Sequence, residues 1–354
     1  MAFNPHTAED RSEMLAVIGI DDVSELFDPI PVDVRRPALD LPPRLTEMEA
    51  AAYLDKLASK NLVPNGADSF LGAGSYRHYS PATVSQLLLR GELFTAYTPY
   101  QPEVAQGTLQ IIYEFQSLIA ALLDMDVANA SMYDGATALA EAVHMAITAS
   151  KKKNKVVLSG TIHPNYLEVI QSYSAGATFE IASLPLPAVG LATTADELVA
   201  AIDDNTAAVV VQYPNFFGTI EDLAAIADAV HAAGAYLIVA TYPVPLSLLK
   251  PPGAYGADFV TAEGQSLGVA QSFGGPYVGL LATKQEFVRQ MPGRLVGMTS
   301  DSEGKRGYVL ALQTREQHIR REKATSNICT NQGLMATAAT IYMSLIGPEG
   351  FREV

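Results

Sequence analysis

Cysteine is nearly absent from this chain of 354 residues, and tryptophan is missing altogether. A single cysteine, Cys329, excludes a disulfide within the chain and any zinc site built from several cysteines. We expect Cys329 to be a small, semi-buried residue. No apolar run reaches the roughly 18 residues of a membrane-spanning helix, and the N-terminus lacks the basic start and apolar core of a signal peptide. The sequence therefore predicts a cytoplasmic protein, and no metal site is expected.

Positive charge is also scarce, because 23 lysines and arginines stand against 38 aspartates and glutamates, giving a net charge of −15. So acidic a chain is a poor match for nucleic acid or for an anionic membrane surface. Hydrophobic residues make up 49% of the sequence, which is enough for the core of one large domain with smaller pieces. These proportions indicate a globular protein whose main partner is neither nucleic acid nor membrane.

From about residue 155, short apolar runs alternate with helical stretches, the pattern of a parallel α/β fold. Residues 209–211 and 237–239 are continuously apolar, which is typical of strands covered on both faces. We therefore predict a mostly parallel central sheet with helices on both faces. The expected strands are Lys155–Leu158, Thr178–Ala182, Ala207–Gln212, Ala235–Ala240, Ala257–Val260 and Tyr277–Ala282. The expected helices are Pro164–Tyr173, Ala195–Ile202, Ile220–Ala233 and Lys284–Gln290.

The first 60 residues differ from the rest. Thr7 with Asp10, and Thr46 with Glu49, have the spacing of capping boxes ahead of two amphipathic stretches, the first ending at Gly19 and the second covering Ala50–Lys60. The prolines between them predict an extended crossing segment; they are Pro29, Pro31, Pro37, Pro42 and Pro43. We interpret residues 1–60 as a helical arm laid over a neighbouring surface.

Gln265 occupies the most informative position in the sequence. The expected strand 257–260 leads into Glu263-Gly264-Gln265-Ser266-Leu267-Gly268, and Phe273-Gly274-Gly275-Pro276 leads into the next strand. This order is typical of the loop in which a pyridoxal-phosphate enzyme carries the lysine that binds its cofactor as an imine. The amide nitrogen of glutamine is neither basic nor nucleophilic enough for that bond. The chain has the layout of a cofactor enzyme whose chemistry has been removed.

Two further segments carry groups suited to a site. Residues 95–103 place Tyr97, Tyr100, Gln101 and Glu103 in a loop stiffened by prolines, where phenol hydroxyls can donate and accept hydrogen bonds. A tight turn packed by aromatic rings explains this loop equally well. Gly135 opens an expected helix whose backbone N–H groups can face an anion. That signal is weak by itself, because neither a dinucleotide fingerprint nor a Walker lysine accompanies it.

Several segments match one family in order. They are Pro5-His6-Thr7, 95–103, 128–141, Lys250-Pro251-Pro252-Gly253-Ala254-Tyr255-Gly256-Ala257-Asp258, 264–268, Arg315-Glu316-Gln317-His318-Ile319-Arg320-Arg321 and Ser326-Asn327-Ile328. Together they resemble the P-protein of the glycine cleavage system, specifically the α subunit (subunit 1) of the two-subunit bacterial glycine decarboxylase. The resemblance covers nearly the whole chain.

The resemblance implies fold type I of the pyridoxal-phosphate enzymes, with an α and a β chain that look like duplicated versions of one ancestor. In that family the β chain carries the cofactor lysine ahead of a glycine-rich turn, and counting back from Pro276 places the lysine position at Gln265. Ala240 stands where such folds carry the aspartate that pairs with the pyridine nitrogen, and His163 lies near the position of the ring-stacking histidine. Gly135 remains a candidate residual anion site in a chain expected to bind no cofactor covalently.

The function implied by the resemblance is a noncatalytic but required subunit of glycine dehydrogenase (aminomethyl-transferring). The complete enzyme is expected to decarboxylate glycine and to pass the aminomethyl group to the lipoyl arm of the H-protein. Pyridoxal phosphate belongs on the β subunit of an α2β2 assembly, while this chain, inactive alone, walls the shared cleft and excludes water. No residue of this chain is expected to be catalytic; the site-lining or interface candidates are Tyr97, Tyr100, Gln101, Glu103, His163, Gln265, Arg320 and Asn327.

Two other functions stay open. The chain could be an independent pyridoxal enzyme, resembling a cysteine desulfurase or an aldolase, that uses an unexpected lysine. The surroundings of the available lysines lack the burial that would lower an ammonium pKa toward neutrality; these lysines are Lys250, Lys284, Lys305 and Lys323. The remaining alternative is a non-enzymatic scaffold for the H-protein.

The expected boundaries are an arm over residues 1–60, a large α/β domain over 61–332, and the start of a smaller C-terminal domain over 333–354. Family members continue past the point that corresponds to Pro348-Glu349-Gly350-Phe351, so we expect the small domain to be truncated. Its expected helix runs over Leu334–Leu345 and is capped by Gly347-Pro348.

Overall fold

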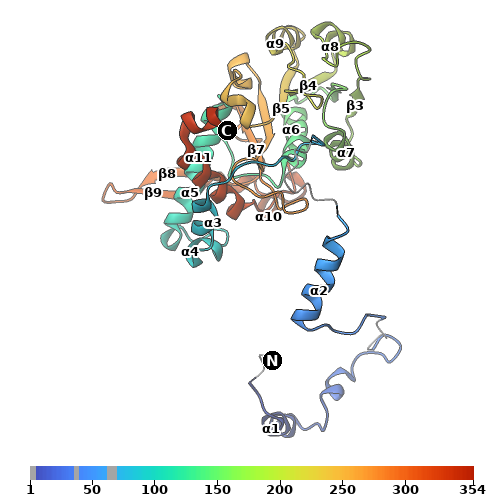
Figure 1. Cartoon of the computed structure of the whole chain (residues 1–354), viewed down its shortest axis with the longest axis vertical. Helices are drawn as coiled ribbons and strands as arrows, with labels where there is room; N and C mark the ends of the chain where they lie inside the picture. The colour runs from blue at the N-terminus through green and yellow to red at the C-terminus, as the bar shows by residue number, and fades with distance from the viewer. Residues whose placement is uncertain (1–4, 36–39, 62–69) are drawn as a thin grey trace. The chain divides into compact units, whose positions relative to one another are not determined.

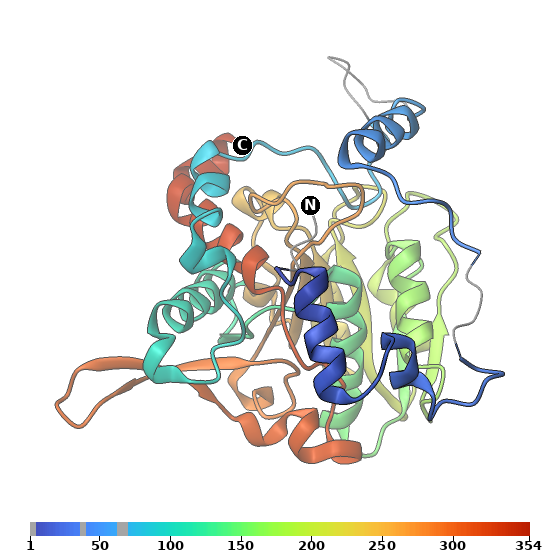
Figure 2. The same cartoon turned by 90° about the horizontal axis from the view of Figure 1, so that it is seen from below.

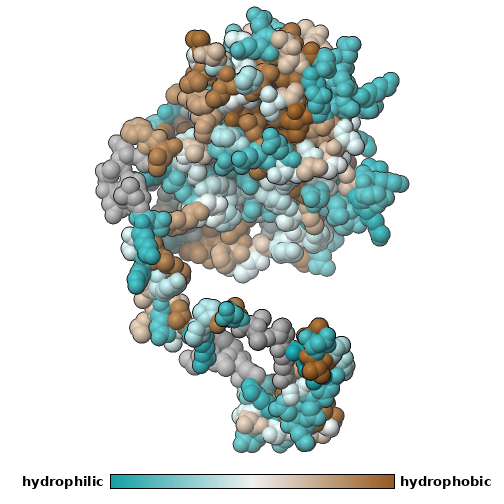
Figure 3. All heavy atoms as spheres, turned by 90° about the vertical axis from the view of Figure 1, so that its right-hand side faces the viewer, coloured by the Kyte–Doolittle hydropathy of each residue, from teal (hydrophilic) through white to brown (hydrophobic). Residues whose placement is uncertain are grey.

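The computed structural model describes residues 5–35, 40–61 and 70–354. The chain divides into two compact units, residues 1–69 and 70–354. In the first unit, helices α1 (Ala8–Ile18) and α2 (Glu47–Ala58) start at the two predicted capping boxes, and a 3-10 turn, η1 (Val23–Phe27), lies between them. Neither helix buries a residue, and Figure 3 shows apolar and polar side chains mixed over the surface of this unit.

The predicted extended proline segment is only partly found. Pro29 and Pro31 lie in turns closed by the bonds Ile30 N to Phe27 O and Val34 N to Pro31 O. Pro42 and Pro43 lie in irregular chain, and Pro37 falls outside the described residues. The hydrogen-bonded turns form because a proline still offers its carbonyl as an acceptor, although it lacks an N–H.

The second unit is built on a seven-stranded sheet with the order β1-β7-β6-β5-β4-β2-β3. Strands β3, β2, β4, β5 and β6 are parallel to their neighbours, and β7 and β1 complete the sheet in antiparallel register. The predicted mostly parallel sheet is therefore confirmed. The strands are β1 (Val127–Ala128), β2 (Lys155–Leu158), β3 (Glu180–Ser183), β4 (Thr206–Tyr213), β5 (Tyr236–Thr241), β6 (Phe259–Glu263) and β7 (Gly279–Thr283).

Helices cover both faces of this sheet (Figure 1). Alternate residues of the central strand β4 divide between two cores, because successive side chains of a strand point to opposite faces. Val209 and Val211 pack with α5 (Gln106–Leu123), α9 (Leu223–Ala232) and α11 (Gly333–Glu353). The opposite face packs on α6 (Gly135–Ser150) and α7 (Pro164–Tyr173).

The remaining elements lie around this three-layer body. A hairpin of β8 (Leu295–Ser300) and β9 (Arg306–Ala311) projects from it, as Figures 1 and 2 both show. Short helices and 3-10 turns make up other parts of this unit. They are α3 (Ala82–Leu88), α4 (Gly91–Phe94), α8 (Ala195–Ala201) and α10 (Gln317–Arg320), with 3-10 turns η2 (Pro102–Val104) and η5 (Gln285–Phe287) among them. No helix within the described residues is both long and apolar enough to cross a membrane.

Two sequence predictions need correction. The helix expected over 284–290 is only the turn η5, because Phe287 anchors it against the Phe259 ring at 4.7 Å and Pro292 lacks the N–H needed to continue a helix. Cys329 is exposed, since the buried Ile328 takes the inward position beside it. Within α11 the backbone is non-helical at Gly347, where φ is +57°, so the predicted end at Gly347-Pro348 is found and a second helical stretch follows it to residue 353.

Candidate functional site

The predicted site residues His163 and Gln265 come together at the carboxyl ends of the parallel strands. His163 follows β2, and Gln265 follows β6 after Glu263, the last residue of that strand. Open parallel sheets bind ligands at this edge, because the loops that leave neighbouring strands meet there. Both residues therefore lie at the edge of the sheet where the sequence places the candidate site.

Gln265 is 1% exposed, and both polar atoms of its side chain are hydrogen-bonded within the chain. Its amide Nε2 donates to Val269 O at 2.8 Å, and its Oε1 accepts from Tyr76 N at 3.3 Å. Its backbone N–H donates to Glu263 Oε1 at 2.9 Å. Gln265 therefore joins the distant Tyr76 to its own local stretch, 263–269.

Glu263 fills the anion site that was predicted at the start of α6. Its Oε2 accepts from the backbone N of Gly135 at 2.9 Å, while Asp134 caps the same helix by accepting from Thr137 N at 2.8 Å. Burial raises the pKa of Glu263 to about 7, since the charged form loses hydration. A Cβ on Gly135 would lie 2.9 Å from Glu263 N and 2.5 Å from the Tyr166 hydroxyl. The helix N-terminus is closed by side chains of this protein.

His163 is likewise surrounded by its own chain. Its ring stacks on Tyr166 with centroids 4.8 Å apart and planes 11° apart, and Phe216 packs at 4.8 Å. Because Nδ1 accepts from Asn165 N, the proton is assigned to Nε2, which donates to Ala73 O at 2.9 Å. A Cβ on Gly74 would lie 3.0 Å from two ring atoms. The backbone at residues 73 and 74 thus lies directly against the imidazole.

The segment that follows continues across the strand ends. Tyr76 packs edge-on against Tyr242 with centroids 5.2 Å apart, and His78 Nε2 lies 2.5 Å from the Tyr242 hydroxyl. Ser75 Oγ lies 2.7 Å from the Tyr277 hydroxyl. Burial lowers the pKa of His78, so its neutral form is favoured in this setting. We call residues 73–78 the plug.

These residues do not fit pyridoxal phosphate, the cofactor that the fold implies. Gln265 cannot form an imine, and Ala240, which pairs with Gln212 and Thr261 in the sheet, offers no carboxylate to a pyridine nitrogen. The Gly135 N–H that would meet a phosphate already binds Glu263. A phosphate placed there would also face the Glu263 and Asp134 carboxyls.

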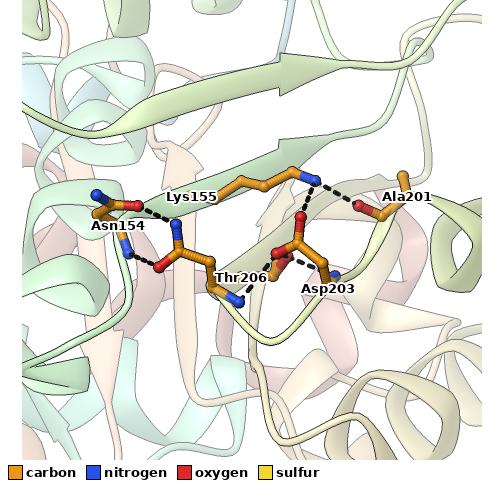
Figure 4. A network of polar contacts seen from close by, with 6 residues as sticks. Asn154, Lys155, Ala201, Asp203 and Thr206 are labelled. Carbon is orange, nitrogen blue, oxygen red and sulfur yellow. Dashed lines mark hydrogen bonds and ion pairs between the residues drawn. The ribbon is translucent and has the colours of Figure 1, made fainter.

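Of the four lysines weighed from the sequence, Lys305 and Lys323 are exposed, and Lys250 and Lys284 have other partners. Lys284 Nζ lies 2.5 Å from Asp258 Oδ1, and Lys250 Nζ lies 4.3 Å from the centre of the Tyr255 ring. Lys155 lies at the start of β2, whereas His163 follows the other end of that strand. Figure 4 shows its Nζ bound to Asp203 and to Ala201 O, each at 2.8 Å. The ammonium groups of Lys155, Lys250 and Lys284 are each held by another partner.

The predicted loop 97–103 lies at the surface. Tyr97 is 82% exposed, and Gln101 and Glu103 are exposed beside η2. Tyr100 is 55% exposed and accepts a hydrogen bond from Nη2 of Arg294 at 2.9 Å, with the guanidinium carbon 5.4 Å from the ring centre. The loop is therefore attached to Arg294 through Tyr100 and to Gln106 through Pro102 O at 2.7 Å, and the sequence did not single out either partner.

Arg320 and Asn327 are exposed in a different segment, and no contact joins them to Gln265 or His163 among the bonds of the described residues. Sequence reasoning also missed the roles of Glu263, Tyr166 and Arg294. A carboxylate at the end of a mostly apolar strand is the one signal that could have pointed to Glu263.

Comparison with known proteins agrees with this layout. The family model for the glycine cleavage system P-protein matches residues 1–354. The chain is 57% identical to the probable glycine dehydrogenase (decarboxylating) subunit 1 of Thermomicrobium roseum over 354 residues, which cover 100% of this chain and 79% of that protein. It is 55% identical to the protein of the same name from Xanthobacter autotrophicus over 359 residues, with the same coverage.

Solved structures give the same picture. A crystal structure of glycine decarboxylase (P-protein) of the glycine cleavage system, in inhibitor-bound form, matches with a TM-score of 0.90 and 46% identity, covering 100% of this chain and 79% of that one. A sphingosine-1-phosphate lyase from Burkholderia pseudomallei matches with a TM-score of 0.60 and 16% identity over 92% of this chain and 74% of that one. At that identity the likeness shows the fold alone.

Proposed function

The chain belongs to the glycine cleavage system P-protein family, and from this membership we propose that it is the noncatalytic α subunit of a two-subunit glycine decarboxylase. Relatives that align over its whole length are named subunit 1, which implies a partner subunit in the same enzyme. Its fold is that of the pyridoxal-phosphate enzymes of fold type I.

One observation carries the noncatalytic assignment. The site at the strand ends is closed by hydrogen bonds of the chain to itself, with Gln265 on Val269 and Tyr76, and with Glu263 on Gly135. A missing lysine alone would leave an open pocket, whereas here its neighbours have taken the positions that a cofactor needs. The role of Gln265 in this proposal is to hold the plug in place.

The chemistry then belongs to the partner subunit. We infer that pyridoxal phosphate is bound there, in an α2β2 assembly that delivers an aminomethyl group to the lipoyl arm of the H-protein. The part of this chain is to wall the shared cleft and keep water out of it. The exposed loop with Tyr97, Tyr100, Gln101 and Glu103 is the segment proposed to reach the partner's site. His318–Asn327, with Arg320, is the second proposed contact, and a cytosolic location stays a prediction.

Borohydride trapping tests the assignment. The chain is incubated with pyridoxal phosphate, alone and with its partner subunit, then reduced and analysed by mass spectrometry. We expect a lysine adduct only on the partner. An adduct on this chain would instead support the independent-enzyme alternative.

Exchange of the glycine carboxyl carbon with bicarbonate separates a required subunit from a scaffold. We expect the partner subunit to exchange carbon at a substantially higher rate after this chain is added. If the rate did not change while the two chains formed a complex, the chain would be a scaffold and not part of the decarboxylating unit.

A further inference from the structure

Arg294 is a buried charge whose hydrogen-bonding capacity is largely unused. Its side chain lies at the start of β8 in a residue that is 2% exposed. Nη2 donates to Tyr100, but Nε and Nη1 have no hydrogen-bond partner among the described residues. Among the ion pairs of those residues, none includes Arg294. A buried guanidinium without a counter-ion is costly, and such groups usually face an anion.

The backbone around Arg294 holds it in place. Its carbonyl accepts from Ala130 N at 2.9 Å, and two residues later Val296 exchanges hydrogen bonds with the Gln116 side chain at 2.9 and 3.0 Å. Arg294 therefore lies at a fixed strand start, and the Tyr100 hydroxyl that accepts its one printed side-chain hydrogen bond belongs to a half-exposed ring. The buried charge thus lies directly beneath a side chain that reaches the surface.

The same loop also lines a cavity of about 150 Å³. Tyr97 and Thr98 line it together with Asn331, whose Nδ2 donates to Ala130 O at 2.9 Å. Ala130 is the residue bonded to the backbone of Arg294. The cavity, the loop and the arginine thus meet around one short stretch of backbone.

Arg315 offers a comparison within the same region. Its side chain is partly buried, and Nη1 donates to Met291 O while Nη2 donates to Gly293 O at 2.9 Å. Its Nε has no partner among the described residues, but both terminal nitrogens are bonded to carbonyls. Arg294, just before β8, has only Nη2 bonded among those residues, so its Nη1 and Nε are both left without a partner.

We propose that Arg294 binds a carboxylate that comes from outside this chain, at the side of the guanidinium that Tyr100 covers. A guanidinium presents two parallel N–H groups that match the two oxygens of a carboxylate. The proposal rests on the subunit function given above, in which the carboxylate belongs either to glycine or to an acidic side chain of the partner subunit. Both sources share one chemistry, and the experiment below separates them.

The test uses the assembled enzyme with Arg294→Met, which removes the charge but keeps a long side chain. Arg306→Met is the matched control, because Arg306 also lies over a tyrosine, Tyr308 at 5.9 Å, but is exposed. Two quantities are measured: the dissociation constant of the two subunits, and KM for glycine in carboxyl exchange with bicarbonate. We expect one of them to rise about 10- to 100-fold for Arg294→Met, the loss typical of a hydrogen-bonded charge.

A rise in KM with unchanged assembly assigns the carboxylate to glycine, and weaker assembly with unchanged KM assigns it to the partner subunit. If Arg294→Met folds and leaves both quantities at their wild-type values, the receptor proposal is wrong while the subunit function stands. If the wild-type chain itself gives no gain in exchange, the subunit function fails instead.

A second measurement tests the proposal even if Arg294→Met does not fold. Sodium acetate is titrated into the wild-type enzyme against sodium chloride at equal ionic strength. Acetate should compete in a saturable way and raise whichever of the two quantities, the subunit dissociation constant or KM, Arg294→Met affects. Arg294→Lys keeps the charge but loses the paired N–H groups, so acetate should change that quantity several-fold less in this variant. Equal effects of acetate and chloride on the wild-type enzyme would overturn the proposal.

Discussion

The strand-end site around Gln265 and the surface site around Arg294 are opposites in how their polar groups are used. At the first, Gln265, Glu263 and His163 are bonded to groups of the same chain. At the second, a buried guanidinium has two nitrogens with no partner in the part of the chain that the structure describes, and it lies under an exposed tyrosine. The polar groups of the strand-end site are hydrogen-bonded within the chain. In our proposal, those of the loop region gain their hydrogen bonds only from a partner or a ligand.

The comparison bears on whether the chain lost only the cofactor lysine or the whole cofactor site. A pocket that lacks only its lysine would keep an open helix N-terminus, because nothing forces an internal carboxylate onto it. Glu263 on Gly135 and the plug against His163 show that groups which a cofactor would contact are already bonded within the chain, although a cavity of about 550 Å³ is still lined by Gln265 and His78.

The largest expected effect comes from forcing the closed site open with Gly135→Val. Its Cβ would meet the Tyr166 hydroxyl at 2.5 Å and Glu263 N at 2.9 Å, so buried groups have to move. We expect a loss of at least about 3 kcal/mol in unfolding free energy, measured by denaturant titration. Gly107→Val in α5 is the control, since nothing lies within 4 Å of its Cβ position. Equal stability of the two variants would mean that the pocket has room.

Glu263→Gln should change how stability depends on pH. The pKa of Glu263 in the folded protein is raised from 4.5 to about 7. Its contribution to the free energy of unfolding is therefore fully present below about pH 4.5 and is lost as pH rises through 7. At about 1.4 kcal/mol per pKa unit, the wild type should lose up to about 3 kcal/mol relative to the variant across that range.

Denaturant titrations between pH 4.5 and 8 measure this difference. Glu197→Gln is the control, because Glu197 is an exposed capping residue whose pKa is lowered by its bonds to Thr194. Its contribution is therefore lost as pH falls, which is the opposite direction. Parallel pH curves for wild type and Glu263→Gln would show that Glu263 is hydrated and that the site is open.

The smallest effect is expected at the other site. Tyr100→Phe removes the hydroxyl that accepts from Arg294, and the isolated chain should lose about 1 kcal/mol in unfolding free energy. Tyr97→Phe, in a residue that is 82% exposed, should leave stability unchanged. If both variants behaved alike, Tyr100 would not be the cover of a buried charge.

The sequence predicted the parts of the fold that have strong local signals. Strand 155–158 and helix 164–173 have the predicted bounds, because an apolar run and a proline at the first helical turn mark them. The hairpin of β8 and β9 was missed, since Met298 and its neighbours are exposed and give no alternating pattern. Exposed strands are fixed by their partner strand more than by their own residues.

The position of Gln265 was found because the surrounding loop and glycine turn lie close to it in sequence. The hydrogen bonds that close the site were not predicted, because they join distant segments. Glu263 and Gly135 are 128 residues apart, and Tyr76 and Gln265 are 189 residues apart. The plug also belongs to no helix or strand, so no periodic pattern marks it. Arg294 gave no signal because its meaning depends on burial and on missing partners.

The most direct test of the central claim restores the missing lysine. The Gln265→Lys variant is incubated with pyridoxal phosphate, its visible spectrum is recorded, and borohydride reduction is followed by mass analysis of the peptide containing position 265. We expect no visible band and no label at that position, because Glu263 and the plug still occupy the site. A labelled peptide with an imine absorbance would contradict the account, since the lysine would then be the only part of the cofactor site that this chain has lost.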